Sequence, residues 1–391
     1  MLIRQLELVD FRSYERLDLR LSDGLTAIIG PNGVGKTNVV EALSLLATLK
    51  SFRGAPTESM VKRGAASAVV RAIGERDGRE VSIDLELAKG RSRAQVNKQR
   101  LQRSRDLLGA VRVTVFAPDD LALVKEGPAL RRDFLDDVIV ALDPSADGVL
   151  RDIERILKQR NALLRQCNGR LDEAAEGTLE VWDMKLAAAG EHLTVRRENT
   201  LSQLMPGVAS AYDELASEAS DVTAFYDRSW SQDSLAEGVA DARDHDVRRG
   251  TTSVGPHRDD VSFRVNGFDS RVEASQGEQR TLALALRMAG HRLVADHLGE
   301  SPLLLLDDVL SELDPDRARI LLATLPPGQT IITSASELPA GTVPDQTLRY
   351  AGQGAAGSGF IQSSASAATE TEAAGSTEPA TQDRAGGTTH E

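Results

Sequence analysis

The sequence has 391 residues, of which 41% are hydrophobic and 27% charged, as in ordinary globular proteins of one large or two smaller domains. The apolar run Leu303–Leu306 is far too short to cross a bilayer, and the first residues lack the pattern of a secretory leader. We therefore expect no membrane partner and a cytoplasmic, nucleoid-associated location. The single cysteine, Cys167, excludes an intrachain disulfide framework and a multi-cysteine metal site.

The formal net charge of −13 by itself argues against nucleic-acid binding. DNA binding, however, depends on local basic patches more than on the net charge. Seven basic residues and no acidic ones lie between Lys89 and Arg105. A solvated face is the more frequent explanation of such a run, but a basic stretch in an acidic protein favours DNA phosphates. The candidate DNA contacts in this stretch are Arg91, Arg93, Lys98, Arg100 and Arg103. Arg131 and Arg132 are weaker candidates, and the lack of interleaved aromatic residues favours sequence-independent backbone binding.

The N-terminal third has the pattern of a sheet. Residues 2–21 alternate in polarity and predict two strands joined by a turn at 11–14, and the short apolar strand 25–29 ends at a glycine-rich segment. A helix is expected over 38–49. Further strands are expected over the ranges 68–74, 80–87 and 110–116.

Helical spacing of apolar residues begins after about residue 127 and indicates an inserted lobe. We expect helices over 130–141, 144–167, 171–204 and 208–219, the last two separated by Pro206-Gly207. Strand character returns over 251–265, and the last elements expected are a helix at 277–297, a buried strand at 303–306, a helix at 314–325 and a strand at 330–333. The sequence thus predicts an α/β head over 1–128 and 250–352, a mainly helical lobe over 129–249 and a disordered tail over 353–391.

The strongest motif follows the third expected strand. Gly30-Pro31-Asn32-Gly33-Val34-Gly35-Lys36-Thr37 matches the phosphate-binding loop in full and lies between a buried strand and a helix. Its glycines let backbone N–H groups curl around phosphate oxygens at the start of a helix. Lys36 is the candidate for the β- and γ-phosphates, and the Thr37 hydroxyl is the candidate ligand for Mg²⁺. ATP and Mg²⁺ are therefore the expected cofactors.

Two acids end the buried strand Leu303–Leu306. We assign Asp307 to Mg²⁺, directly or through water, and Asp308 to orienting or deprotonating the attacking water. Upstream, Ser275-Gln276-Gly277-Glu278 opens a helix. By itself this segment favours an ordinary capped helix, but its place before the acid-ending strand favours a functional segment.

The order of these motifs, followed by Ser311-Glu312-Leu313-Asp314, is that of an ABC ATPase head with a mixed sheet. Within that superfamily the chain resembles the RecF family, which is related to SMC heads. Besides the motifs above, the resemblance is carried by five segments between residues 1 and 352. They are Leu8–Tyr14, Phe116–Leu121, Arg131–Asp136, Leu157–Asn161 and Gly255–Asp260.

The resemblance implies a mechanism and partners. Two heads would sandwich two ATP molecules, with Lys36, Thr37, Asp307 and Asp308 acting in one copy while Ser275, Gln276 and Gly277 reach the γ-phosphate held by the other. Arg12 would be a further phosphate contact, with a surface-turn residue as the alternative. The resemblance also implies single-stranded, gapped or junction DNA, the partners RecR and RecO, recombinase loading and the SOS response.

Two other classes of function compete with this interpretation. A transporter ATPase is expected to carry a glutamine loop, where this chain has Pro118-Asp119-Asp120, and a switch histidine, where it has Ser334-Ala335. A structural SMC clamp needs far longer helical arms. Together with the aspartate at position 308 in place of glutamate, these departures predict slow hydrolysis that acts as a timed switch.

Overall fold

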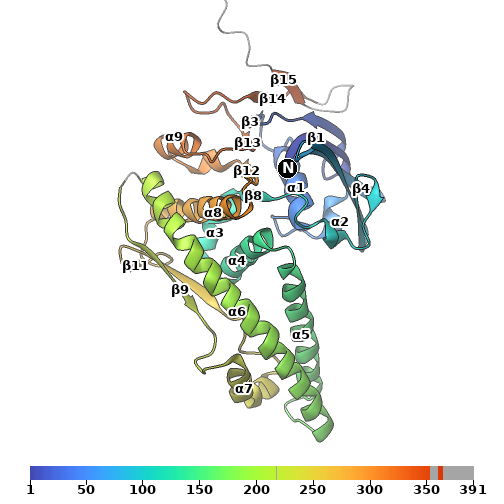
Figure 1. The fold of residues 1–391 in the computed structure, drawn as a ribbon, viewed down its shortest axis with the longest axis vertical. Coiled ribbons are helices and arrows are strands. Elements are labelled where there is room, and N and C mark those ends of the chain that lie inside the picture. The colour runs from blue at the N-terminus through green and yellow to red at the C-terminus, as the bar shows by residue number, and fades with distance from the viewer. Residues whose placement is uncertain (217, 353–359, 364–391) are drawn as a thin grey trace, which may run out of the picture.

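The computed structural model describes residues 1–216, 218–352 and 360–363 (Figure 1). Its first layer is an antiparallel sheet with the strand order β2-β1-β4-β5-β6-β7. The strands are β1 (Leu2–Phe11), β2 (Tyr14–Arg20), β4 (Ser67–Arg76), β5 (Arg79–Ala88), β6 (Arg91–Val96) and β7 (Gln99–Arg100), and the short helix α2 (Thr57–Met60) precedes β4. The expected strand–turn–strand opening is present.

The second layer is a six-stranded sheet with the order β15-β14-β3-β13-β12-β8, parallel except for β15. Its strands are β3 (Leu25–Ile29), β8 (Val113–Phe116), β12 (Leu303–Asp307), β13 (Thr330–Ser334), β14 (Gln346–Tyr350) and β15 (Phe360–Ser363). Helix α1 (Lys36–Thr48) shares a hydrophobic core with strands of both sheets. Because parallel strands end at one edge, the ends of β3 and β12 bring the phosphate loop and the acids to the same edge.

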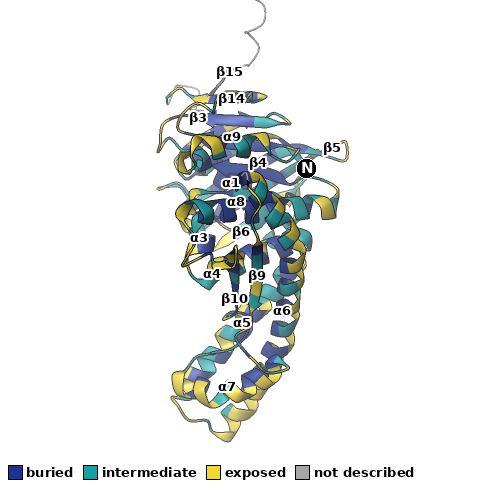
Figure 2. Cartoon of the chain, turned by 90° about the vertical axis from the view of Figure 1, so that its left-hand side faces the viewer, coloured by how far each residue is buried: buried dark blue, intermediate teal, exposed yellow. Residues whose placement is uncertain are grey.

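The helical part extends away from the sheets as an arm (Figures 1 and 2). The helices α3 (Leu121–Lys125) and α4 (Pro128–Leu142) lie beside α8 (Gln276–Leu298) next to the sheets, and the arm is formed by α5 (Ala146–Gln166), α6 (Glu173–Ala216) and α7 (Leu235–Arg249). The expected break at Pro206 is wrong, since α6 runs through it. Proline removes one backbone donor, but buried residues on both sides of it, including Leu204 and Val208, keep the helix packed in one continuous core.

A three-stranded sheet joins the arm to the head. It is ordered β11-β10-β9 and consists of β9 (Val222–Asp227), β10 (Asp260–Val265) and β11 (Phe268–Asp269). The sequence did not predict β9 or α7, and the strand expected from residue 251 begins only at Asp260. Because β9 pairs with β10, the expected helical lobe and the expected head share a sheet, and their core is common as well. The division into two lobes stays a prediction.

The remaining elements complete the head. They are the helices α8 (Gln276–Leu298) and α9 (Pro315–Ala323) and the 3₁₀ turns at Ser104–Leu107, Pro118–Asp120 and Val309–Glu312. Of the tail expected to be disordered, Phe360–Ser363 forms β15 against the free edge of β14. Residues 353–359 and 364–391 lie outside the described part of the chain. Across the described residues no helix is long and apolar enough to cross a membrane.

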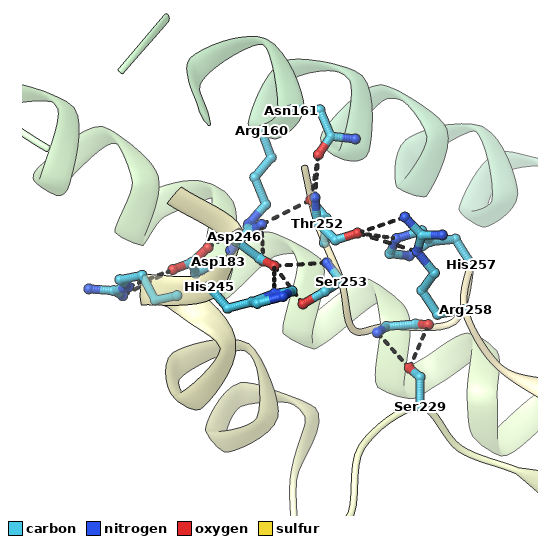
Figure 3. Close-up of polar contacts among 12 residues, drawn as sticks. Arg160, Asn161, Asp183, Ser229, His245, Asp246, Thr252, Ser253, His257 and Arg258 are labelled. Atoms are coloured by element: carbon cyan, nitrogen blue, oxygen red, sulfur yellow. Dashed lines mark hydrogen bonds and ion pairs between the residues drawn. The ribbon is translucent and has the colours of Figure 1, made fainter. Parts of the chain in front are cut away.

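Arg160 and Asn161, in one of the segments that carried the family resemblance, make buried polar contacts inside the arm (Figure 3). The fully buried Arg160 donates to Asp183 (2.8 Å), Asp246 (2.7 Å) and Thr252 (2.9 Å), and the neighbouring Asn161 accepts from Thr252. These contacts tie α5, α6 and α7 to the segment that leads to Gly255–Asp260. The buried ion pairs join the three helices to one another, and hydrogen bonds from Arg160 and to Asn161 fix the segment at Thr252. The ion pairs require all their partners because an unpaired buried charge is costly.

His257 lies in the segment Gly255–Asp260 and is half-buried. Its Nε2 lies 3.3 Å from the Thr252 carbonyl oxygen, and burial lowers the pKa of His257 to about 4. The side chain is therefore neutral at pH 7. Gly255 adopts φ 125°, and its N–H donates to the Ser229 hydroxyl (2.8 Å), which shapes the turn expected here.

Candidate nucleotide-binding site

The phosphate loop joins β3 to α1 with two glycines in conformations that other residues rarely adopt. Gly33 has φ 81° and Gly35 has φ 107°, and a Cβ added at Gly35 would lie 2.6 Å from the Tyr14 hydroxyl. The Gly30 N–H donates to the Ser334 carbonyl at 3.2 Å, which fixes the start of the loop to β13. Space around Gly33 is open, so the exposed tip of the loop leaves room for a ligand near the start of α1.

Lys36 begins α1 and is only 5% exposed. Its ammonium group donates to the carbonyls of Gly30 (2.7 Å) and Pro31 (2.9 Å) within the loop. Burial lowers the pKa of Lys36, and the carboxylates of Asp308 and Asp307 partly offset that effect. A phosphate would therefore provide Lys36 with a stronger acceptor than the carbonyls it now contacts.

Thr37 and Asp307 meet across the edge of the sheet, as the sequence predicts. The Thr37 hydroxyl donates to Asp307 Oδ1 at 3.1 Å, and the buried Thr333 hydroxyl donates to the same oxygen at 2.8 Å. Burial raises the pKa of Asp307, although the two hydroxyl donors counteract it. Hydroxyl and carboxylate oxygens fit Mg²⁺, which takes one or two protein ligands together with substrate phosphates. Within the described residues no group of three or more His, Cys, Asp and Glu could hold a metal ion.

Asp308 follows Asp307 in a left-handed conformation with φ 50°. Its backbone N–H donates to the Thr333 hydroxyl at 3.0 Å, and its carbonyl accepts from the Ser311 hydroxyl at 2.7 Å. Non-glycine residues in this region are uncommon and often found at functional sites. The side chain is half-buried beside the Lys36 charge. This geometry suits the role of water activation that the sequence assigns to Asp308.

Arg12 lies in the turn between β1 and β2 and makes protein contacts through three nitrogens. Its Nε and Nη2 donate to Glu41 at 2.7 and 2.6 Å, and Nη1 donates to the Ser59 carbonyl at 2.9 Å. Glu41 is fully buried on α1 and also accepts a hydrogen bond from Ser51. The expected phosphate contact of Arg12 would therefore compete with a buried carboxylate. Sequence reasoning missed Glu41, whose only local signal is an acid on the apolar helix after the phosphate loop.

The remainder of this turn supports the phosphate loop. The Ser13 hydroxyl accepts from Asn38 at 2.9 Å, and the ring of Tyr14 fills the space that a side chain at Gly35 would occupy. The Tyr14 hydroxyl is buried without a hydrogen-bond partner among the described residues, and its burial raises the pKa of the phenol. Gly35 is therefore required by close packing as well as by its backbone angle.

The signature segment forms a complete helix cap. The Ser275 hydroxyl accepts from the Glu278 N–H at 3.3 Å, and Glu278 accepts from the Ser275 N–H at 2.8 Å. The ordinary capped-helix interpretation is thus correct as a local structure, but it leaves Ser275 and Gln276 exposed. A Cβ at Gly277 would lie 3.1 Å from Arg317 Nη1, so the glycine makes room for an arginine of α9. Because the cap is already complete, its exposed residues can contact a second molecule without a change in the conformation of the helix.

Ser334 and Asp120 lie where a transporter ATPase would carry its switch histidine and its glutamine loop, and both residues have structural roles in this chain. Ser334 ends β13 and holds Gly30 through its carbonyl. In the loop after β8, Asp120 accepts from Arg287 of α8 at 2.7 Å, which fixes the loop to that helix.

All five candidate DNA contacts are exposed and lie at one edge of the first sheet, on β6, on β7 and in the turns beside them. Ala94 of β6 is buried, so strand alternation directs Arg91 and Arg93 to the opposite, outer face. Two of the five have acidic neighbours: Arg93 lies 3.4 Å from Glu86, and Arg103 lies 3.1 Å from Asp106. Arg91, Lys98 and Arg100 remain unneutralised by any ion pair within the described chain.

Arg131, one of the two weaker candidates, is buried and its charge is paired within the chain. It is 4% exposed, forms a two-pronged ion pair with Asp260 (2.8 and 3.0 Å) and donates to the Glu126 carbonyl. Arg132 donates to the Asp259 carbonyl at 2.6 Å, and burial lowers its pKa. The helical pattern did not show that both side chains face the head. Arg131 connects α4 to β10, and its charge is already neutralised.

The fold and the site together define an ATPase head of the ABC class, in its SMC-like form. A family model described as RecF/RecN/SMC N terminal domain matches residues 2–338. A protein of Streptomyces avermitilis named DNA replication and repair protein RecF is 41% identical over 350 residues, which cover 85% of this chain and 93% of that protein. A protein of Frankia alni with the same name is 43% identical over 356 residues, covering 86% and 93%. The chain belongs to the RecF family.

Solved structures agree with this membership. The recombination mediator protein RecF with ATP, described as part of the RecFOR pathway, has a TM-score of 0.82 at 30% identity, covering 89% of this chain and 95% of that one. An SMC head bound to the C-terminal winged-helix domain of ScpA has a TM-score of 0.56 at 17% identity, covering 94% of this chain and 98% of that one. This second likeness concerns the fold alone.

Proposed function

We propose that this chain is an ATP-dependent DNA-binding protein of recombinational repair and replication-fork maintenance. One observation carries the proposal: Lys36, Thr37, Asp307 and Asp308 are gathered in one copy, while Ser275 and Gln276 are exposed on a separate, preformed helix cap. The phosphate-loop residues would bind the nucleotide within one copy. The exposed cap at Ser275 is free to contact a nucleotide that is held by a second copy, so the arrangement suits two copies that share their nucleotides. The names of the relatives support the repair function.

The residues have distinct roles in the proposed cycle. Bound ATP and Mg²⁺ supply the phosphoanhydride and the cation that neutralises its charge. Lys36 exchanges the carbonyls of Gly30 and Pro31 for phosphate oxygens, and Thr37 and Asp307 hold the cation. Asp308 orients the attacking water or accepts its proton. Ser275, Gln276 and Gly277 contact the γ-phosphate held by the second copy. Arg12 joins them only when it leaves Glu41.

Hydrolysis then acts as a release switch. A phosphate that contacts both copies makes dimer affinity depend on the state of the nucleotide, because its departure removes the bridging charge. The aspartate at position 308, Ser334 at the switch position and the tethered loop at Asp120 support slow turnover. The partners we propose are single-stranded, gapped or junction DNA and, by analogy with the pathway of the solved relative, RecR and RecO. Recombinase loading and the SOS response follow from the same analogy.

Molecular mass tests the proposal directly. Sedimentation of the full chain with ATP, with ADP and with a slowly hydrolysed ATP analogue is measured with and without a gapped duplex. We expect a dimer with ATP and its analogue, a monomer with ADP, and tighter DNA binding by the dimer. DNA binding measured at two salt concentrations should weaken as salt rises, because phosphate contacts release counterions. A chain that stays monomeric with ATP and DNA would contradict the shared site.

The basic edge of the first sheet is the proposed DNA surface. Changing Arg91, Arg93 and Lys98 together to glutamate should weaken DNA binding on the order of tenfold or more and reduce its salt dependence, while ATP affinity stays unchanged. The control is Arg155→Glu, which reverses one exposed charge on the arm, at a side chain 69% exposed. Equal DNA affinity of the triple variant and the control would show that the edge is only a solvated face.

A further inference from the structure

Strand β11 and the short turn between it and the signature segment expose two large apolar side chains. Val272 is 80% exposed and Phe268 is 60% exposed, and they lie three and seven residues before Ser275. Single exposed apolar residues are common on protein surfaces and need no explanation. What distinguishes this turn is that it is rigid and attached to the signature helix.

Hydrogen bonds fix the turn from both ends. Asp269 accepts from the Arg271 N–H (2.8 Å) and the Val272 N–H (3.2 Å), while the Glu273 carboxylate accepts from the Asp269 N–H (2.8 Å). The Glu273 N–H donates back to the Asp269 carbonyl at 2.9 Å. Val272 is therefore held outward at the top of a closed turn, so the exposure of its side chain is not due to a loose loop.

Gln279 connects this turn to the signature helix. The side chain of Gln279 is 5% exposed, and its amide donates to the carbonyls of Ser270 (3.0 Å) and Arg271 (3.2 Å). Gln279 is one helical turn into α8, and its backbone N–H donates to the Ser275 carbonyl at 3.0 Å. Val272 and the Ser275–Gly277 segment thus form one rigid surface.

We propose that this turn, with Val272 at its centre, is an apolar docking surface for a second copy of the chain. The inference rests on the proposed function, whose shared site requires a second copy at Ser275. Three residues of chain span at most about 11 Å, so Val272 lies within that distance of Ser275, beside the place where a second copy would deliver its phosphate. The second copy approaches with the exposed tip of its phosphate loop, which includes Pro31 and Asn32. Apolar contact beside the phosphate gives the dimer affinity and register that the nucleotide alone does not supply.

A charge at position 272 tests the surface against a matched control. Val343 is 81% exposed, almost the same as Val272, but it precedes β14, whose first residue Gln346 pairs with Thr26 near the start of β3. It therefore lies at the sheet edge opposite the phosphate loop. We compare the wild-type chain, Val272→Asp, Val272→Leu and Val343→Asp by sedimentation with ATP over a range of concentrations. A fluorescent ATP analogue at low protein concentration reports binding by the monomer, and thermal unfolding reports folding.

The expected result is that Val272→Asp binds the analogue as well as the wild type does but weakens the ATP-dependent dimer at least about tenfold. Val272→Leu and Val343→Asp should dimerise like the wild type. If Val272→Asp and Val343→Asp dimerise equally well, the docking surface is overturned while the shared site stands. If the wild-type chain and Val343→Asp bind ATP but stay monomeric, the shared site of the proposed function fails, and this surface fails with it.

Discussion

The phosphate-loop half and the signature half of the candidate site are built in different ways. In the first half, buried and half-buried groups satisfy one another within the chain: Lys36 with the loop carbonyls, and Thr37 and Thr333 with Asp307. In the second half, the Ser275 cap is complete, but Ser275, Gln276 and Val272 face solvent. Because the two halves are built differently, substitutions in one half should affect ATP binding and substitutions in the other should affect association of two copies. Phosphate-loop changes should remove ATP binding itself, whereas signature changes should leave it intact and remove only association.

The largest effect is expected for Lys36→Met. This substitution removes the only cation within the loop, and ATP affinity should fall on the order of a hundredfold or more because a charge-assisted phosphate contact is lost. The fold should persist, since the hydrogen bonds of the Lys36 side chain are confined to Gly30, Pro31 and Asn32 of the loop itself. Calorimetric ATP titration, with thermal unfolding as the control, measures both quantities. If the variant still showed the full ATP-dependent shift in sedimentation, the mechanism in which two copies hold ATP between them would be wrong.

Asp307→Asn should separate function from stability within the phosphate-loop half. Hydrolysis should fall on the order of a hundredfold because a Mg²⁺ ligand loses its charge. The free chain should become more stable at pH 7, by on the order of 1 kcal/mol, because a buried carboxylate is replaced by a neutral group that still accepts from Thr37 and Thr333.

The pH dependence of this stability follows from the direction of the pKa shift. The pKa of Asp307 is raised in the folded chain, so the folded state takes up a proton more readily than the unfolded state. The penalty for the buried charge is fully present well above the raised pKa and is lost as the pH falls through it. The gain in melting temperature of Asp307→Asn over the wild type should therefore shrink between neutral and acidic pH. A gain that grows on acidification would show that the carboxylate stabilises the fold.

Gln276→Ala should have a smaller effect, and on association only. The Gln276 side chain is exposed and forms no hydrogen bond in the described part of the chain, so unfolding free energy should change by less than about 0.5 kcal/mol. ATP binding by the monomer should be unaffected, while the ATP-dependent dimer should weaken about tenfold. Sedimentation beside an ATP titration distinguishes these quantities. A loss of monomer ATP affinity would place Gln276 in the site of its own copy and remove the contrast between the halves.

Much of the phosphate-loop half was predictable because its signals are local. A buried strand, a glycine-rich turn and a helix follow one another within residues 25–48, and parallel strands must end at one edge, so Thr37 and Asp307 were expected to meet. The continuous α6 was not predictable, because Pro206 is a local signal for a break whose cost is outweighed by packing along the whole helix. The strand β9 was missed because its pairing partner, β10, lies more than thirty residues away along the chain.

The sequence by itself determined the class of protein, the order of its motifs and the residues that the fold gathers at the candidate nucleotide site. Only the tertiary structure decided how several charged and apolar side chains are used. It pairs Arg12 with the buried Glu41, neutralises Arg131 with Asp260, and holds Val272 outward beside the signature helix. The physical reason is that motifs arise from neighbours along the chain, whereas ion pairing and exposure depend on which distant segments the fold brings together.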